Sequence, residues 1–182
     1  MEFMDMQLKR ESCRIYSEKP VSREMLIRLV DVARLSPSGC NAQPWRFIIV
    51  DEPEARRKVM EALYDGELTG CPWGDKVPAF ILICEDEAHL MPGVGEHYGS
   101  QHFAQMDIGM AAMALCCEAA SIGLGTCMIG TMSQEKLHKA FDIPAERTVR
   151  LIITVGHPAR EGAPRKKNRK SLEEILSFNQ WQ

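Results

Sequence analysis

The most distinctive segment of the chain, rich in turn-forming residues, is Ser36-Pro37-Ser38-Gly39-Cys40-Asn41-Ala42-Gln43-Pro44-Trp45-Arg46-Phe47. A helical pattern ends before this segment, and the apolar run Ile48-Ile49-Val50 follows it. Two prolines and a glycine restrict the backbone, while serine, asparagine and glutamine supply short polar side chains. Two interpretations are open: a tight helix-to-strand turn with Trp45 and Phe47 in the core, or a rigid polar loop that holds a planar polar ligand.

Helical and strand patterns alternate on both sides of this loop. The apolar spacing predicts helices over 5–12, from Ser22 as N-cap to before Pro37, and over 54–63, 102–122 and 134–141. Strands are predicted over 47–50, 79–84, 126–129 and 149–155, and irregular segments over 64–77 and 85–100. The alternation indicates one domain over 1–182 with an α+β or α/β sheet flanked by helices.

Composition excludes several classes of function. The 182 residues carry a formal net charge of −3, which gives no overall attraction to nucleic acid or to an anionic membrane. Residues 1–7 lack the apolar core of a signal peptide. Segment 108–134 is nearly uncharged, but Glu118 near its middle would cost about 2.5–3.5 kcal/mol in a bilayer, and Gly123 and Gly125 interrupt it. It is therefore predicted to be a buried helix and a buried strand.

The seven cysteines form no Cys-x-x-Cys pair, and several lie in apolar runs. Their odd number and setting predict reduced, mostly buried thiols and a cytoplasmic location. Cys40 differs because it lies in the polar loop, where it could be a reactive thiol. We find no His-x-x-x-His pair and no paired carboxylates at helical spacing, so no metal site is expected.

Three further segments could carry chemistry. Arg10-Glu11-Ser12-Cys13-Arg14 would place two guanidiniums on one face of a helix turn with a hydroxyl between them, which suits a phosphate or an ordinary solvated surface. The run 123–131 is glycine-rich and is either a helix end with a buried strand or a ligand loop. The run 165–170 has five basic residues, which suits a solvated tail, an anion site or a nucleic-acid patch without aromatic residues.

Together these segments resemble, in order and spacing, the nitroreductase-like FMN proteins, and the resemblance extends from Arg10 to Leu172. It rests on Arg10-x-Ser12-x-Arg14, Ser36-Pro37-Ser38-x-x-Asn41-x-Gln43-Pro44-Trp45, the glycine-rich run and Lys167-x-Arg169 after Gly156-His157-Pro158-Ala159. The resemblance implies the following flavin contacts: phosphate at Arg10, Ser12, Arg14, Lys167 and Arg169; the flavin at Pro37, Ser38 and Asn41; and backbone near N5 at Ile129, Gly130 and Thr131. Thr131 departs from the commoner glycine.

The resemblance also implies an α+β fold with a central mixed or antiparallel sheet, in an intertwined homodimer whose 36–47 loop crosses the interface. The small residues of the 102–122 helix suit close packing or such a dimer seam. The implied activity is ping-pong hydride transfer from NADH or NADPH through FMN to a nitroaromatic, quinone or similar acceptor. Reductive dehalogenation, flavin fragmentation and a flavin-binding sensor remain alternatives. His97, Tyr98 and His102 are candidates for a substrate pocket.

Overall fold

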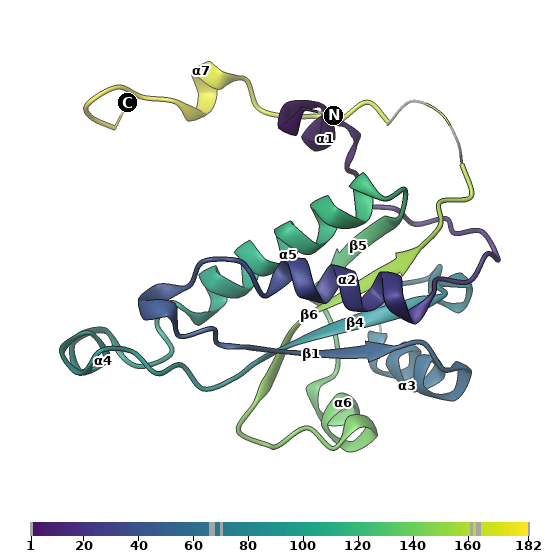
Figure 1. Ribbon diagram of the computed structural model, residues 1–182, viewed down its shortest axis with the longest axis horizontal. Helices are drawn as coiled ribbons and strands as arrows, with labels where there is room; N and C mark the ends of the chain where they lie inside the picture. The colour runs from purple at the N-terminus through teal and green to yellow at the C-terminus, as the bar shows by residue number, and fades with distance from the viewer. Residues whose placement is uncertain (1, 66–67, 70, 161, 163–164, 182) are drawn as a thin grey trace.

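A four-stranded antiparallel sheet forms the centre of the molecule (Figure 1). The computed structural model describes residues 2–65, 68–69, 71–160, 162 and 165–181. The strands are β1 (Trp45–Val50), β4 (Ala79–Glu85), β5 (Gly125–Ile129) and β6 (Thr148–Gly156), in the spatial order β1-β4-β6-β5. The predicted α+β class and the antiparallel option for the sheet are therefore confirmed.

Helices cover both faces of the sheet (Figure 1). Helices α2 (Arg23–Ala33) and α5 (Ala104–Ser121) pack on one face, and α3 (Pro53–Leu63) and α6 (Gln134–Phe141) on the other. Strand β4 serves both cores: Ile81 and Ile83 belong to the α2/α5 side, whereas Phe80 and Leu82 belong to the α3/α6 side. Because both faces are covered, the strand is apolar from Ala79 to Cys84 and lacks the alternation of a half-exposed strand.

The end of α5 fixes the start of β5. Gly123 has φ +80°, a backbone conformation that glycine adopts at little cost. The N–H of Leu124 donates to the carbonyl of Ala119 at 2.8 Å, and that of Gly123 donates to Ala120 at 3.4 Å. This is the Schellman arrangement, and it confirms the predicted glycine termination.

Two sequence predictions about the N-terminal half are wrong. Helix α1 (Phe3–Lys9) ends before residue 12, and Arg10 is already extended, with φ −60° and ψ 127°. Ser12 forms an isolated parallel bridge with Thr126 at the edge of β5. Arg10, Ser12 and Arg14 therefore lie on an extended segment, where backbone pairing with β5 replaces the expected helical turn.

The two segments predicted to be irregular contain short elements. Residues 85–100 include α4 (Pro92–Tyr98), which has no buried residue and so gives no apolar periodicity. Within 64–77, β2 (Tyr64–Asp65) pairs with β3 (Leu68–Thr69), and a 3₁₀ turn, η2, spans Gly74–Lys76. Residues 66, 67 and 70 of that prediction lie outside the described part of the chain.

The C-terminal tail extends away from the sheet (Figure 1). Its short helix α7 (Leu172–Ile175) begins with a capping box between Ser171 and Glu174. Leu172, Ile175, Leu176, Phe178 and Trp181 are all exposed, Trp181 to 98%. Among the described residues, no helix has the length and apolarity needed to cross a membrane.

Candidate functional site

The loop after α2 contains three strained residues. Cys40, Asn41 and Gln43 have φ values of 53°, 54° and 50°, in the left-handed region that side-chain-bearing residues seldom adopt. The hydroxyl of Ser38 accepts a hydrogen bond from the backbone N–H of Gln43 at 2.9 Å and holds the turn closed. Backbone strain of this kind is concentrated at ligand-binding and catalytic loops. The loop therefore departs from an ordinary helix-to-strand turn.

Asp107 fixes this loop to α5. Its side chain is buried, and both carboxylate oxygens accept from the backbone N–H of Gly39, each at 3.1 Å. A side chain at position 39 would meet Phe103 at 3.0–3.2 Å, so the close approach favours glycine. The sequence-based site did not include Asp107. Its signal was the carboxylate that precedes the apolar run in the long helix.

Extended backbone places the N-terminal cationic residues differently from a helix. In an extended segment alternate side chains point to the same side, so Arg10, Ser12 and Arg14 can still share one side. The Arg14 guanidinium lies over the Trp73 ring, 5.4 Å from its centroid, in a cation–π contact. Trp73, which the sequence-based site omitted, thus belongs to its surroundings.

The basic tail contacts this segment, as the resemblance implied. The Lys167 ammonium donates to the carbonyls of Leu8 at 2.6 Å and Arg10 at 2.9 Å. Burial and the nearby positive charges of Arg10 and Arg169 lower the pKa of Lys167. Arg169 is exposed, and its charge lies close enough to act on Lys167.

Arg165 connects the same two segments through Glu11. Its guanidinium donates to the Glu11 carboxylate at 3.1 Å and to the carbonyl of Ser12 at 2.9 Å. Partial burial opposes ionisation of Glu11, but these hydrogen bonds prevail and lower its pKa. The Glu11 carboxylate is therefore paired with Arg165, a cation that the sequence-based site did not include.

The remaining cations form a donor set that fits a phosphate. The buried Nε of Arg10 has no hydrogen-bond partner within the described part of the chain. A buried donor without a partner costs about 1–3 kcal/mol, so such groups are normally satisfied by a ligand or by water. Arg10, Arg14 and Lys167 supply planar and point-charge donors of the kinds that bind phosphate oxygens.

The end of β5 offers accessible backbone. Ile129 is buried in the core, but Gly130 and Thr131 are exposed. A side chain at position 130 would meet no atom within 4 Å, so the space beside Gly130 is open. This is the strand edge along which Ser12 bridges to Thr126. The Ile129 side chain therefore has a core role, and only its backbone can face a ligand.

One chain does not unite the two halves of the expected site. Pro37, Ser38 and Asn41 are anchored near Asp107, whereas Arg10 shares a cavity with Ala120 at the other end of α5. Asp107 and Ala120 are 13 positions apart along the helix, which is about 20 Å. The loop and the cationic cluster are thus held apart by a rigid element.

An aromatic cluster lies beside the loop. Tyr98 contacts His97, His102 and Phe103, with ring centroids 4.5, 5.3 and 6.1 Å apart. Phe103 in turn faces Gly39. The three residues considered for a substrate pocket are therefore neighbours of one another and of the strained loop. No group of three or more potential metal ligands occurs among the residues that are described.

Known proteins are similar to this chain in sequence and fold. The family model described as "Nitroreductase family" matches residues 8–70 and 67–157. A putative NADH dehydrogenase/NAD(P)H nitroreductase of Archaeoglobus fulgidus is 29% identical over 164 residues, covering 88% of this chain and 87% of the relative. An NAD(P)H FMN reductase of Bacillus subtilis is 28% identical over 176 residues, covering 90% and 68%.

Two further proteins are similar to this chain. The crystal structure of a nitroreductase family protein from Clostridium difficile 630 superposes with a TM-score of 0.83 at 26% identity, over 100% of both chains. An iodotyrosine deiodinase of Nematostella vectensis is 24% identical over 199 residues, covering 96% of this chain and 74% of the relative.

Proposed function

Because the chain belongs to the nitroreductase family of oxidoreductases, we propose that it is an FMN enzyme that oxidises NADH or NADPH and reduces a conjugated acceptor in a ping-pong cycle. Nitroaromatics and quinones are the proposed acceptors. The observation that supports this proposal most directly is the cationic cluster in which Lys167 contacts Arg10, whose buried Nε has no partner among the described residues. The named activities of the relatives are consistent with it.

The chain's own residues would bind and orient the cofactor. Arg10, Ser12, Arg14, Lys167 and Arg169 would hold its phosphate. The exposed backbone of Gly130 and Thr131 would donate hydrogen bonds where negative charge develops. When bound, FMN would supply the redox chemistry, so no side chain of this chain has to act as nucleophile.

We further propose that two chains form the working unit. A second copy could bring the 36–47 loop to the cationic cluster that α5 holds away from it. Met106, Gly109 and Met110 form an exposed stripe on α5, with Met106 56% and Met110 42% exposed. The apolar tail beyond Ser171 also leaves its large side chains uncovered. Both features support an interface between copies.

Light scattering of Met110→Glu tests the dimer. The charge should separate the copies and weaken FMN binding together, while circular dichroism stays unchanged because Met110 is exposed. Met91→Glu alters an exposed methionine outside α5 and serves as the matched control. A monomeric wild-type protein that binds FMN fully would contradict this part of the proposal.

The state of the thiols supports a cytoplasmic location, which we also propose. All seven cysteines are free, and five of them are buried. Burial raises the pKa of Cys71 to about 12 and that of Cys116 to about 11, which keeps these thiols protonated. Such usage is typical of a reducing compartment.

Absorbance spectroscopy tests the activity. The purified protein, or the protein after addition of FMN, should show flavin bands that bleach on anaerobic addition of NADH or NADPH and return with a quinone. Protein that stays colourless with added FMN would refute the cofactor assignment. Bands that persist with both donors, and no steady-state turnover, would instead indicate a flavin-binding module.

Reductive dehalogenation is the second candidate, because a deiodinase is among the relatives. The aromatic cluster around Tyr98 could stack on a halogenated ring. Halide release from a halotyrosine by the reduced protein, with little nitroaromatic reduction, would favour this candidate over the first.

A further inference from the structure

Tyr16 is a buried tyrosine with no role in the proposed chemistry. It is 4% exposed and belongs to the apolar core on the α3/α6 side of the sheet. Its ring packs so closely against β6 that a side chain at Gly156 would lie 2.6 Å from it. Burial raises the pKa of Tyr16 well above that of a free phenol, so its hydroxyl keeps its proton. A buried hydroxyl of this kind needs hydrogen-bond partners.

The Tyr16 hydroxyl connects the N-terminal segment to the sheet. It donates to the carbonyl of Cys13 at 2.9 Å, and its oxygen lies 2.6 Å from the hydroxyl of Thr154. Because a phenol has one proton and a carbonyl can only accept, Thr154 donates in the second contact. Thr154 is fully buried, and its hydroxyl accepts from the N–H of Cys127 at 3.0 Å and lies 3.3 Å from the carbonyl of the same residue. One chain of hydrogen bonds therefore runs from Cys13 through β6 to β5.

Tyr16 lies where the N-terminal segment changes its pairing partner. Before it, the N–H of Cys13 donates to the carbonyl of Thr126 in β5 at 2.8 Å. After it, the N–H of Ser17 donates to the carbonyl of His157, just beyond β6, also at 2.8 Å. The bond from the Tyr16 hydroxyl to Cys13 closes the turn between these two pairings.

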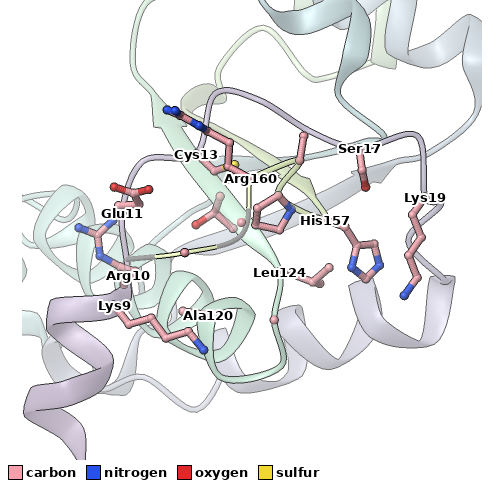
Figure 2. Close-up of a pocket in the computed structure, with 16 residues that line it drawn as sticks. Lys9, Arg10, Glu11, Cys13, Ser17, Lys19, Ala120, Leu124, His157 and Arg160 are labelled. Carbon is pink, nitrogen blue, oxygen red and sulfur yellow. The ribbon is translucent and has the colours of Figure 1, made fainter. Parts of the chain in front are cut away.

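A cavity leaves one side of this segment uncovered. Its volume is about 780 Å³, and Figure 2 shows Arg10 at one side of it and Ser17 at the other, with Cys13 between them. The segment is thus not packed against the rest of the molecule along its whole length. On the sheet side, its position depends on the backbone pairing with β5 and on the hydroxyl contacts of Tyr16.

We propose that Tyr16 and Thr154 are positioning residues for cofactor binding: their paired hydroxyls set the place of segment 10–14, which would hold the FMN phosphate. This inference rests on the proposed function. Hydrogen bonds to phosphate oxygens need defined distances and angles, so a displaced segment would lose them. Contacts of the flavin ring with other parts of the chain would remain. Loss of either hydroxyl therefore weakens the binding of FMN more than that of riboflavin, which has no phosphate.

Titrations that follow flavin fluorescence test this proposal. Tyr16→Phe removes one hydroxyl and keeps the ring against Gly156, whereas Thr154→Val removes the other in a side chain of the same shape. Each should weaken FMN binding about fivefold, the scale of one hydrogen bond, and riboflavin binding less than about twofold. Thr154→Ser keeps its hydroxyl and should bind FMN as the wild-type protein does. Tyr64→Phe, at an exposed tyrosine, is the control and should change neither affinity.

Hydrogen exchange on the flavin-free protein separates this inference from the proposed function. The Cys13 amide, which donates to Thr126, should lose protection in Tyr16→Phe, whereas the Gly39 amide, which donates to Asp107, should keep it. If the wild-type protein binds neither flavin, the proposed function fails. The exchange measurement then still shows whether Tyr16 holds the segment in place.

Three results would overturn the proposal. One is unchanged protection of the Cys13 amide in Tyr16→Phe. Another is an equal loss of FMN and riboflavin affinity in that variant, which would give Tyr16 a general structural role. The third is an FMN affinity of Thr154→Ser as low as that of Thr154→Val, which would assign the effect to the side-chain volume at 154 and not to its hydroxyl.

Discussion

The backbone N–H of Gly39 donates to both carboxylate oxygens of Asp107, at 3.1 Å each. This contact joins a loop with three left-handed residues to the first turn of α5. A carboxylate is also favoured there by the helix dipole. The loop is therefore anchored through one buried ionisable side chain.

Asp107→Ala should destabilise the protein by about 1–3 kcal/mol, because it leaves the Gly39 N–H without its acceptor. Asp107→Asn keeps one acceptor oxygen and should cost less. Urea unfolding measures both. Asp31→Ala removes an exposed ion pair with Arg34 and should change stability by less than about 1 kcal/mol. Equal losses in the Asp107 and Asp31 variants would contradict the anchoring role.

Cys40→Gly should raise the free energy of unfolding by about 0.5–1 kcal/mol, because glycine relieves the left-handed strain but has a more flexible unfolded chain. Asp142→Gly is the matched control, since Asp142 has a similar φ of 50° at the end of α6, away from the loop. If Asp142→Gly raises the free energy of unfolding and Cys40→Gly lowers it, the Cys40 side chain makes a stabilising contact. Cys40→Ser should retain reductase activity, as expected if the thiol is not a nucleophile.

Arg14→Ala should weaken FMN binding by about 1.5–3 kcal/mol, the contribution of a hydrogen bond to a charged group. Fluorescence quenching of free FMN on titration with protein measures this affinity. Arg34→Ala is the control, because Arg34 pairs with Asp31 on the exposed side of α2. Unchanged FMN affinity in the Arg14 variant would exclude Arg14 from the phosphate site.

The contact between Glu11 and Arg165 should be lost at acid pH. Since the pKa of Glu11 is lowered in the folded protein, the contact stabilises the fold above the ordinary glutamate pKa and weakens as pH falls through the lowered value. The Arg165 amide donates to Glu11 at 3.2 Å, so its hydrogen-exchange protection factor reports the contact. Protection of the Arg165 amide should fall as the pH is lowered below about 4.3, the ordinary glutamate pKa.

Glu11→Gln provides the control for that measurement. The neutral amide cannot ionise, so the protection of the Arg165 amide should be lower than in the wild-type protein and should lose its dependence on acid pH. A wild-type profile that is flat with pH would show that the contact does not hold the tail.

Strong local patterns made much of the fold predictable. The continuous apolar run of β4 predicts a buried strand, and the glycine after α5 predicts the end of a helix. Helix α4 could not be predicted, because it buries no residue and contains two glycines. The extended course of residues 10–14 could not be predicted either, because pairing of Ser12 with Thr126 across the fold overrides local helical spacing.

The candidate site was predictable in its parts but not in its arrangement. The resemblance to the nitroreductase-like proteins implied that Arg10, Ser12, Arg14 and Lys167 lie together, and Lys167 does contact Arg10. The anchoring of Gly39 by Asp107 depends on two residues 68 positions apart, which no local pattern relates. The separation of the loop from the cluster likewise emerges only from the folded helix between them.

Helix α5 sets both the distance between its two ends and their relative rotation about the helix axis. It separates the anchor of the strained loop from the turn that starts β5, and both ends are fixed by hydrogen bonds. One inserted residue would lengthen it by about 1.5 Å and rotate one end by about 100° relative to the other. The loop and the strand would then no longer face their partners, whereas the exposed α4 segment could change length without this effect. Insertions in homologous chains are therefore expected around α4, while α5 keeps a constant length.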